Sequence, residues 1–438
     1  MSSVTATGQQ ASVNKVAFRL WAIVVLLMVA CMISYFDRIN LSFALLDGDF
    51  KKAFQFSSSE RGLLNSAFFW TYAALQIPAG WVVDRYGSKY PMLFSFVVWS
   101  ALTAVTASIT GFSSLFLIRL LLGVGEAAVQ PAAMRWVRVN FPEKHRGLAI
   151  GIFMSGTKFG PALGATVAAW LIDAAGWRAM FVLLGLVSML WIIPFLLLVK
   201  NDDKGNGNSV GMANLSSVDI PMGRLLASPI LWGTVIGTFC YMYFVYFCLT
   251  WMPAYLNEAR HLSLGSSGFY TTFSFAGMAI VAIVGGWAAD RIIARGHNPV
   301  TVRKAFIITG FLLASTELFG AFLPVNWALF VSVLSLSGLG LTTANYWALT
   351  QTLIPGKSIG RIIGIQNCAA NIPGIVAPLF TGWLLEATGS YVAPMTTVLA
   401  FLVVGIFAYL FLVREKYALD AYIPDAKVGA DIEPEMAR

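Results

Sequence analysis

Residues 115–131, LFLIRLLLGVGEAAVQP, place two full charges inside an otherwise apolar helix. Arg119 and Glu126 are seven residues apart, which is close to two helical turns, so their heads project from one face about 10 Å apart along the axis. An ionised side chain near the bilayer centre costs about 2.5 to 3.5 kcal/mol on insertion scales, so this face is expected to line a bundle interior or an aqueous cavity. A structural ion pair between two helices is the alternative, but intramembrane charge favours a functional site.

The composition indicates a polytopic membrane protein. Of 438 residues, 58% are hydrophobic and only 11% are charged, which is far too apolar for a soluble two-domain protein. The net charge of +8 does not predict a nucleic-acid partner, because the basic residues are spread over many short segments. The four cysteines fall inside apolar runs without a CxxC pair or a histidine at metal spacing. We therefore expect no disulfide framework, metal or cofactor.

The first apolar run could belong to a cleavable signal peptide or to a membrane helix. Lys15 and Arg19 precede it, as in a signal peptide, but no convincing small-residue cleavage site follows. The run continues through Asp37 and Arg38, which suits a first membrane helix that carries a functional pair. Residues 1–17 are expected to form a cytoplasmic tail, largely disordered.

Apolar segments of about 20 residues predict twelve spans. They are placed near 18–46, 59–83, 90–110, 115–139, 148–173, 178–199, 229–256, 266–289, 304–323, 327–350, 362–385 and 391–413. The predicted fold is therefore an all-α membrane protein of two pseudo-symmetric six-helix bundles, 18–199 and 229–413. A polar cytoplasmic linker, 200–228, joins the bundles, and a second cytoplasmic tail follows at 414–438.

The distribution of lysine and arginine predicts the orientation in the membrane. With the N-terminus in the cytoplasm, 21 of the 29 basic residues fall on the inside and five on the outside. This asymmetry satisfies the positive-inside rule. Both termini are therefore expected in the cytoplasm, and the remaining three basic residues, Arg38, Arg119 and Lys158, lie within spans.

The two halves of the sequence repeat each other. GWVVDR at 80–85 recurs as GWAADR at 286–291, and PEKHRGLAIG at 142–151 recurs as PGKSIGRIIG at 355–364. Both motifs occupy equivalent places in the predicted topology. The number of residues between a motif and its repeat is similar for the two motifs. Such a parallel duplication is typical of transporters built from two bundles.

Several charges of the first half are expected at similar depth. At about 1.5 Å per residue, Glu126 lies about 16 Å from the outer end of its span, and Lys158 about 15 Å from the inner end of the next. Because adjacent residues diverge by about 100° on a helix, one of Asp37 and Arg38 should face a cavity and the other a neighbouring helix.

The second half offers only neutral polar groups at mid-depth. Asn371 and Trp347 are candidate ligand contacts opposite the charged half, although a packing hydrogen bond and an interfacial aromatic ring are the alternatives. Glu317 and Glu386 fall near the ends of their spans.

No enzyme signature is present. The GVGE sequence that begins at Gly123 lies in a hydrophobic span and follows no strand, so it is not a nucleotide loop. The three histidines lie in loops, and no catalytic set or Walker loop occurs, so an enzymatic function is not expected. The glycines of the fourth and fifth spans are instead predicted to allow close helix approach, namely Gly123, Gly125, Gly151, Gly156, Gly160 and Gly164.

Four stretches carry a resemblance to a known family: YFDRINLS at 35–42, the segment from FWTY at 69–72 through GWVVDRYGSK at 80–89, Arg119 through EAAVQP at 126–131, and ATGSY at 387–391. Over nearly its whole length the chain resembles a major facilitator superfamily transporter of the anion:cation symporter group, which includes bacterial galactonate, glucarate and phthalate carriers. The G-x-x-x-D-R loop alone indicates only the superfamily, whereas the intramembrane Asp-Arg and Arg-x6-Glu pairs are typical of organic-anion symport.

The resemblance implies roles for individual residues. Asp37 and Glu126 match proton-coupling carboxylates, and Arg38 and Arg119 match their partners and the substrate anchors. Tyr72 matches a substrate-facing hydroxyl. The cytoplasmic gate loop is matched by Asp84, Arg85 and Lys89. Lys158 departs from the sugar-acid carriers, in which a neutral polar group is expected. As a substrate contact it suggests a compact dianion or a strongly acidic monoanion, and the alternative is a lysine that snorkels or is neutral when buried.

The sequence therefore predicts a proton-coupled importer of a small organic anion, such as a sugar acid, dicarboxylate, sulfonate or aromatic acid, that works by alternating access. A multi-pass protein of a bacterial inner membrane, acting as a monomer, is expected. A proton-coupled drug antiporter of the same fold is one alternative, which the excess of buried arginine and lysine disfavours. A non-transporting membrane receptor is the other.

Overall fold

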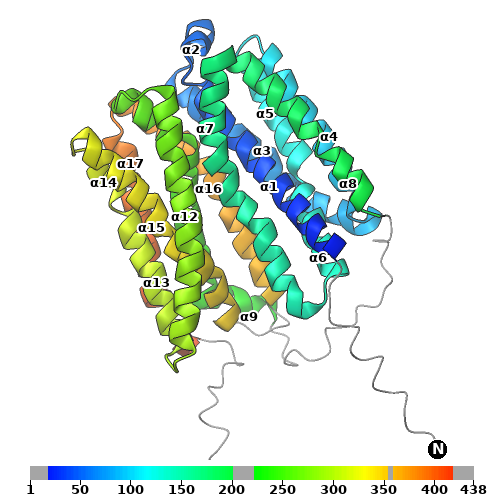
Figure 1. Cartoon of the computed structure of the whole chain (residues 1–438). Coiled ribbons are helices and arrows are strands. Elements are labelled where there is room, and N and C mark those ends of the chain that lie inside the picture. Colours follow the sequence, from blue (N-terminus) through cyan, green and yellow to red (C-terminus); the bar gives the residue numbers. More distant parts are fainter. Residues whose placement is uncertain (1–17, 201–220, 354–358, 418–438) are drawn as a thin grey trace, which may run out of the picture. The chain divides into compact units, whose positions relative to one another are not determined.

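The computed structural model describes residues 18–200, 221–353 and 359–417, and every regular element in these ranges is a helix (Figure 1). The predicted tail 1–17, most of the linker 200–228 and most of the tail 414–438 lie outside the described residues. So does the start of the second repeat motif, 355–358.

Six predicted spans of the first half are helical. The elements are α1 (Phe18–Ala44), α2 (Gly48–Phe54), α3 (Ser58–Tyr86), α4 (Lys89–Val105), α5 (Phe112–Glu126), α6 (Val129–Asn140), α7 (Glu143–Met189) and α8 (Ile192–Leu198). Gly176 interrupts α7 with a φ of 83°, in the left-handed region that glycine adopts without steric cost. The break separates the predicted fifth and sixth spans.

Six further spans follow in the second half. The elements are α9 (Met222–Leu226), α10 (Pro229–Thr250), α11 (Met252–Ala254), the π-helix η3 (Tyr255–Ala259), α12 (Leu264–Ile293), α13 (Pro299–Ala314), α14 (Glu317–Gly320), α15 (Val325–Leu353), α16 (Ile359–Thr388), α17 (Val392–Phe407) and the π-helix η4 (Ala408–Leu412). The described chain is thus an all-α membrane protein with the predicted pattern of six and six spans.

By length and apolarity alone, nine helices of the described ranges are able to cross a membrane. Three of the twelve predicted spans are missing from these nine helices, and each has a physical reason. Residues 145–198 count as one helix although Gly176 divides them, and α13 has only 16 residues. α3 is less apolar than the other long helices, because polar and charged residues lie at both of its ends.

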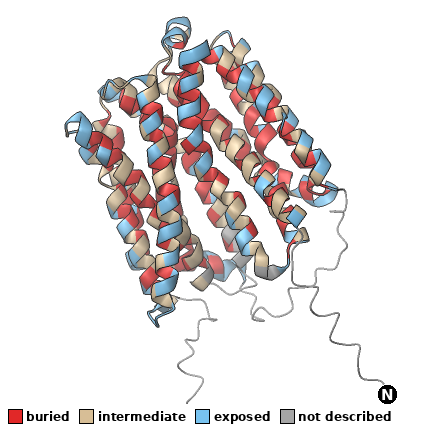
Figure 2. Cartoon of the chain, viewed as in Figure 1, coloured by how far each residue is buried: buried red, intermediate tan, exposed pale blue. Residues whose placement is uncertain are grey.

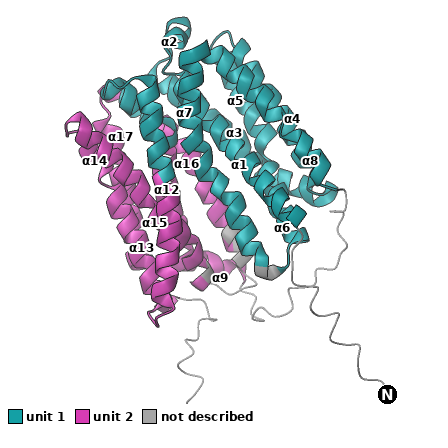
Figure 3. Ribbon diagram, viewed as in Figure 1, with its two compact units in different colours: residues 1–209, 249–276, 381–386 teal, residues 210–248, 277–380, 387–438 magenta. Residues whose placement is uncertain are grey.

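The chain divides into two compact units (Figure 3). Unit 1 holds residues 1–209, 249–276 and 381–386, and unit 2 holds 210–248, 277–380 and 387–438. The helices α10, α12 and α16 therefore contribute residues to both units. The predicted bundle boundaries at 18–199 and 229–413 stay a prediction.

Two lysines reveal the internal repeat in three dimensions. In unit 1, Lys89 Nζ donates a hydrogen bond to the carbonyl of Val199 at 2.6 Å, and in unit 2 Lys304 Nζ donates to the carbonyl of Val413 at 2.8 Å. Each lysine lies near the start of the third span of its half and caps the end of the sixth. A cation at a helix C-terminus is stabilised by the helix dipole, so both halves retain the same closing contact.

The exposed residues of both units, which Figure 2 colours pale blue, include many large apolar ones. Ile77 is 85% exposed, Leu197 78% and Ile283 68%. Exposed side chains of this size are found on most of the long helices of both units. Such a surface is expected of helices that face lipid.

Glycines bring α7 against α1. A Cβ atom added at Gly156 would lie 2.5 Å from the carbonyl oxygen of Met28, and one at Gly160 would lie 2.5 Å from that of Met32. The prediction of close approach is confirmed there and at Gly123 and Gly164. At Gly151 it is wrong, because a Cβ atom would meet nothing within 4 Å.

Gly160→Ala is expected to destabilise the protein, whereas Gly151→Ala on the same helix serves as the matched control. The first change forces α1 and α7 apart, and overpacking of this kind costs about 1 to 3 kcal/mol. The second change meets open space and gains helix propensity. Thermal unfolding in detergent measures both variants. Equal melting temperatures would contradict the assigned packing.

Candidate functional site

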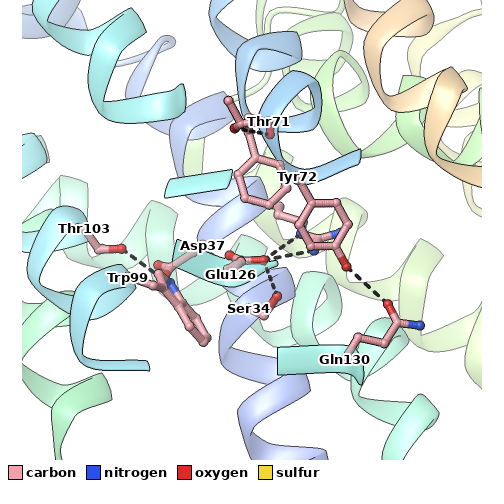
Figure 4. Close-up of polar contacts among 10 residues, drawn as sticks. Ser34, Asp37, Thr71, Tyr72, Trp99, Thr103, Glu126 and Gln130 are labelled. Carbon is pink, nitrogen blue, oxygen red and sulfur yellow. Dashed lines mark hydrogen bonds and ion pairs between the residues drawn. The ribbon is translucent and has the colours of Figure 1, made fainter. Parts of the chain in front are cut away.

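A buried ion pair joins α1 to α5 in unit 1. Arg38 Nη2 lies 2.9 Å from Glu126 Oε2, and Arg38 Nε donates to the same oxygen at 3.3 Å. Ser34 Oγ donates a third hydrogen bond to that oxygen at 2.7 Å (Figure 4). Both charged side chains are almost fully buried, with 3% and 2% exposed. Removing either partner alone would leave an uncompensated charge.

A helix break next to Glu126 shapes this site. The predicted span 115–139 is not one helix, because α5 ends at Glu126 and α6 begins at Val129. Pro131 has no N–H to donate and its ring crowds the carbonyl four residues earlier, so the first turn of a new helix, where it lies in α6, accommodates it best. The break places Gln130 beside Tyr72, whose hydroxyl donates to Gln130 Oε1 at 3.2 Å.

Aromatic rings surround the Arg38 guanidinium. Its central carbon lies 4.3 Å from the ring centroid of Tyr35, 4.7 Å from that of Tyr72 and 4.8 Å from that of Phe68. A cation over a ring face is attracted by the ring quadrupole, most strongly where water is excluded. These rings partly replace the water that the buried charge has lost.

Asp37 points to different neighbours from Arg38. Its Oδ2 accepts hydrogen bonds from Trp99 Nε1 and from Thr103 Oγ1, the latter at 3.1 Å, and its Oδ1 accepts from Asn40 Nδ2 at 3.0 Å (Figure 4). The expected pairing of carboxylates with arginines is therefore found at Glu126. Asp37 is held instead by neutral donors.

Arg119 is buried without a carboxylate partner among the described residues. Its Nε donates to the carbonyl of Leu64 at 3.4 Å, and its guanidinium lies 5.4 Å from the Phe68 ring centroid. Together with Asp37 and Thr103 it lines a small hollow. A guanidinium has five N–H donors, so most of the capacity of Arg119 is open to an acceptor that enters this hollow.

A second small hollow lies on the other side of the ion pair. Its lining includes Ser34, Arg38, Tyr72, Glu126 and Gln130. Lys158 is half-buried on α7, between the two glycines that contact α1. All the residues predicted for proton coupling and substrate binding in the first half belong to unit 1, namely Asp37, Arg38, Tyr72, Arg119, Glu126 and Lys158.

The two candidates of the second half lie in unit 2. Trp347 is half-buried on α15, and its ring lies 5.0 Å from that of Tyr346. Asn371 is half-buried on α16 and donates to the carbonyl of Asn367 at 2.9 Å. Their role in ligand binding stays a prediction.

The residues of the predicted gate loop lie at two helix ends: Asp84 and Arg85 are in the last turn of α3, and Lys89 is the first residue of α4. Asp84 accepts a hydrogen bond from Arg135 Nη1 at 3.0 Å, and the Arg85 guanidinium lies 5.7 Å from the rings of Trp81 and Tyr86. Lys89 caps Val199, as described above. The ion pair between Asp84 and Arg135 therefore joins α3 to α6.

Unit 2 repeats this contact with a different arginine. Asp290, the repeat counterpart of Asp84, pairs with Arg303 Nη2 at 2.8 Å. Arg303 comes from α13, and its Nη1 donates to Asn345 Oδ1 at 3.3 Å. The acid is thus retained in both halves, while its partner comes from another helix.

The contacts of the site that were not predicted include Ser34, Asn40, Trp99, Thr103 and Gln130. Trp99 and Thr103 lie four residues apart, which places them on one helical face, and this spacing is a signal that the sequence offered. Among the described residues, no group of three or more histidine, cysteine, aspartate or glutamate side chains is placed to hold a metal ion.

A helical protein with this many apolar spans, the buried Arg38–Glu126 pair and the buried Arg119 guanidinium has the features of a membrane transporter. A family model described as Major Facilitator Superfamily matches residues 27–378, and the chain belongs to this family.

Similar proteins are named as transporters of organic anions. The chain is 32% identical to a probable sulfoacetate transporter of Cupriavidus necator, over 92% of this chain and 96% of that protein. It is 31% identical to a probable galactarate/D-glucarate transporter of Bacillus subtilis, over 94% of each chain. It is 28% identical to a D-galactonate transporter of Escherichia coli O6:H1, over 91% and 96%.

A solved structure shares the fold. It is a bacterial homolog of the human lysosomal transporter Spinster in an inward-facing and unoccupied conformation. The TM-score is 0.78 at 17% identity, over 92% of this chain and 99% of that one.

The Arg38–Glu126 pair is expected to show strong coupling in a double-mutant cycle. Arg38→Met and Glu126→Gln should each lower the melting temperature, because each leaves a buried polar group without its partner. The double variant should lose less than the sum, with a coupling energy of about 1 to 3 kcal/mol. Thermal unfolding of the four proteins measures it, and additive losses would contradict the pairing.

Proposed function

We propose that the protein imports a small organic anion together with protons by alternating access. The observation that carries this proposal is Arg119, a buried guanidinium whose only hydrogen bond among the described residues goes to a backbone carbonyl. Burying such a cation costs free energy unless an anion binds to it and compensates its charge. Its planar fork of donors suits a carboxylate or sulfonate.

The second anchor becomes available by protonation. Glu126 holds Arg38 in the ion pair, so a proton on this carboxyl weakens the pair and frees the guanidinium. Arg38 and Arg119 then bind the anionic headgroup, and Tyr72 and Gln130 line the hollow beside it. On the other side of the membrane, substrate release and deprotonation restore the pair. Asp37 takes a second proton in this scheme.

Charge balance requires the protons. A membrane potential of about 100 mV, negative inside, opposes anion import by about 2.3 kcal/mol per charge. At least one proton must therefore accompany each negative charge. The names of the relatives, which include sulfoacetate and sugar-acid transporters, support a small acid as the substrate.

The cellular setting is part of the proposal. The excess of basic residues on one side favours cytoplasmic termini, and bacterial relatives favour a bacterial inner membrane. A monomer suffices, because the proposed anchors lie in one chain.

Uptake into proteoliposomes under an imposed pH gradient tests the function. The panel contains sulfoacetate, galactarate, glucarate and galactonate, with a cationic drug as the contrast. Proton-driven uptake of at least one acid supports the proposal. Efflux of the cationic drug in exchange for protons would support an antiporter instead, and binding without flux would support a receptor.

Glu126→Gln is expected to abolish pH-driven accumulation while leaving counterflow exchange largely intact. The neutral amide imitates the protonated carboxyl, so substrate still binds but the proton cycle stops. Ser34→Ala is the control, since it removes one hydrogen bond to the same oxygen and keeps the titratable group. Loss of exchange together with accumulation, in a folded protein, would contradict a coupling role.

Lys158→Gln is expected to weaken binding of a dianion about 10- to 100-fold and to spare monoanions, if Lys158 holds a second negative group. With Glu126 and Asp37 protonated, Arg38, Arg119 and Lys158 carry more positive charge than a monoanion balances. The ratio of the two affinities, for the dianion sulfoacetate and for the monoanion galactonate, is measured by letting each compete with the uptake of a labelled acid of the panel. An unchanged ratio would return Lys158 to a structural role.

A further inference from the structure

A second cluster of ionic contacts lies at the end of unit 1 that carries α2, which we call the α2 face. It is remote from the start of α1 (Figure 1). Here segments of the second half that belong to unit 1, residues 249–276 and 381–386, contact helices of the first half. On the predicted orientation this face lies outside the cell.

The centre of the cluster is a carboxylate held by two cations. Arg61 Nη1 donates to both oxygens of Glu258, at 2.9 and 3.2 Å, and Lys51 Nζ lies 2.8 Å from Oε1. Arg61 and Lys51 come from α3 and α2, and Glu258 comes from η3. Two elements of the first half thus form a carboxylate site, and a side chain of the second half occupies it.

The site has donor capacity beyond Glu258. Arg61 Nε is buried and has no hydrogen-bond partner among the described residues. The guanidinium carbon of Arg61 lies 5.2 Å from the Trp251 ring centroid, which fixes the plane of its fork. The Arg61 side chain is only 11% exposed, whereas that of Lys51 is 42% exposed. A rigid fork with a free donor and a solvent-accessible ammonium beside it are suited to a second carboxylate or a sulfonate.

Neighbouring contacts close the same face. Glu386 accepts hydrogen bonds from Ser57 Oγ at 2.9 Å and from the Ser59 amide at 2.8 Å. Ser42 Oγ donates to the carbonyl of Leu249 at 3.2 Å. These bonds must separate whenever the α2 face opens, and Glu258 then leaves Lys51 and Arg61.

We propose that Lys51 and Arg61 form a capture site for the incoming organic anion, which Glu258 occupies while the α2 face is closed. This inference rests on the proposed function for the identity of the anion. The carboxylate of Glu258 and that of the substrate compete for the same donors. An arriving anion therefore favours opening, and Glu258 reseals the face after the anion has moved inward.

The capture site makes a prediction that a simple latch does not. Glu258→Gln removes the competitor, so the KM for uptake from the α2 side should fall about two- to fivefold, as expected for a partly exposed ion pair. Adding Arg61→Gln to this variant should raise the KM again. If the contact were only a latch, the added change would have no effect, because the contact is already broken.

The control is Lys52→Gln in the same Glu258→Gln background. It removes one positive charge from the same short helix as Lys51, but Lys52 is 83% exposed, and its one ion pair among the residues that the structure describes is with Asp49. A rise of KM with Arg61→Gln and none with Lys52→Gln supports the capture site. Equal KM values for the two double variants would overturn the capture site. This outcome would hold whether or not Glu258 closes the α2 face. The labelled substrate is whichever acid of the panel is transported.

A second arm needs no transport. In a Cys368→Ser background, which removes the exposed thiol, Ser42→Cys reports opening of the α2 face through its reaction with a membrane-impermeant maleimide. Glu258→Gln and Arg61→Gln should both speed labelling. Sodium sulfoacetate should speed it more than sodium chloride of equal ionic strength, and this difference should vanish in Arg61→Gln.

The two arms separate the possible failures. If no acid of the panel is transported, the proposed function fails, while a sulfoacetate effect on labelling that depends on Arg61 still supports the anion site. Labelling that sulfoacetate does not change overturns the site. Labelling that Glu258→Gln does not change overturns the assignment of Glu258 as its occupant.

Discussion

The buried pair of Arg38 and Glu126 is the interaction on which the site depends. Taking two charges out of water costs several kcal/mol per ion, and the pair repays this only with good geometry and further hydrogen bonds. Ser34 and the aromatic rings around Arg38 provide these contacts. The pair holds α1 against α5, and the helix break beside Glu126 turns Gln130 toward Tyr72. The Arg38–Glu126 ion pair thus constrains both the packing of α1 against α5 and the geometry of the polar site.

The two intramembrane carboxyls have different partners, so their protonation has different consequences. In the proposed mechanism, a proton on Glu126 weakens the ion pair with Arg38 and so frees a guanidinium. A proton on Asp37 releases no cation, since Trp99, Thr103 and Asn40 are neutral. Arg119 is already without a carboxylate partner among the described residues. The proposed mechanism therefore uses the two guanidinium groups differently: Arg119 is available throughout the cycle, and Arg38 becomes available when Glu126 is protonated.

The duplicated halves have kept their scaffold and changed their polar contacts. Lys89 and Lys304 cap the last helix of each half in the same way. Asp84 and Asp290 are also retained, yet they pair with arginines of different helices. Helix ends present the same unsatisfied carbonyls in any repeat, so their caps are retained easily. A side-chain pair depends on one rotamer and one neighbour, and diverges more readily.

The sequence by itself determined the number of spans, the duplication and the charged residues of the first half. These follow from apolar length, from repeated motifs and from the cost of charge in a bilayer, all of which are local properties of the chain. Only the tertiary structure decided which charges meet. The Arg38–Glu126 pair joins residues 88 positions apart, and the hold of Trp99 on Asp37 joins residues 62 apart. Helical spacing relates residues within one helix, whereas partners on different helices depend on how glycine contacts such as those of Gly156 and Gly160 bring the helices together.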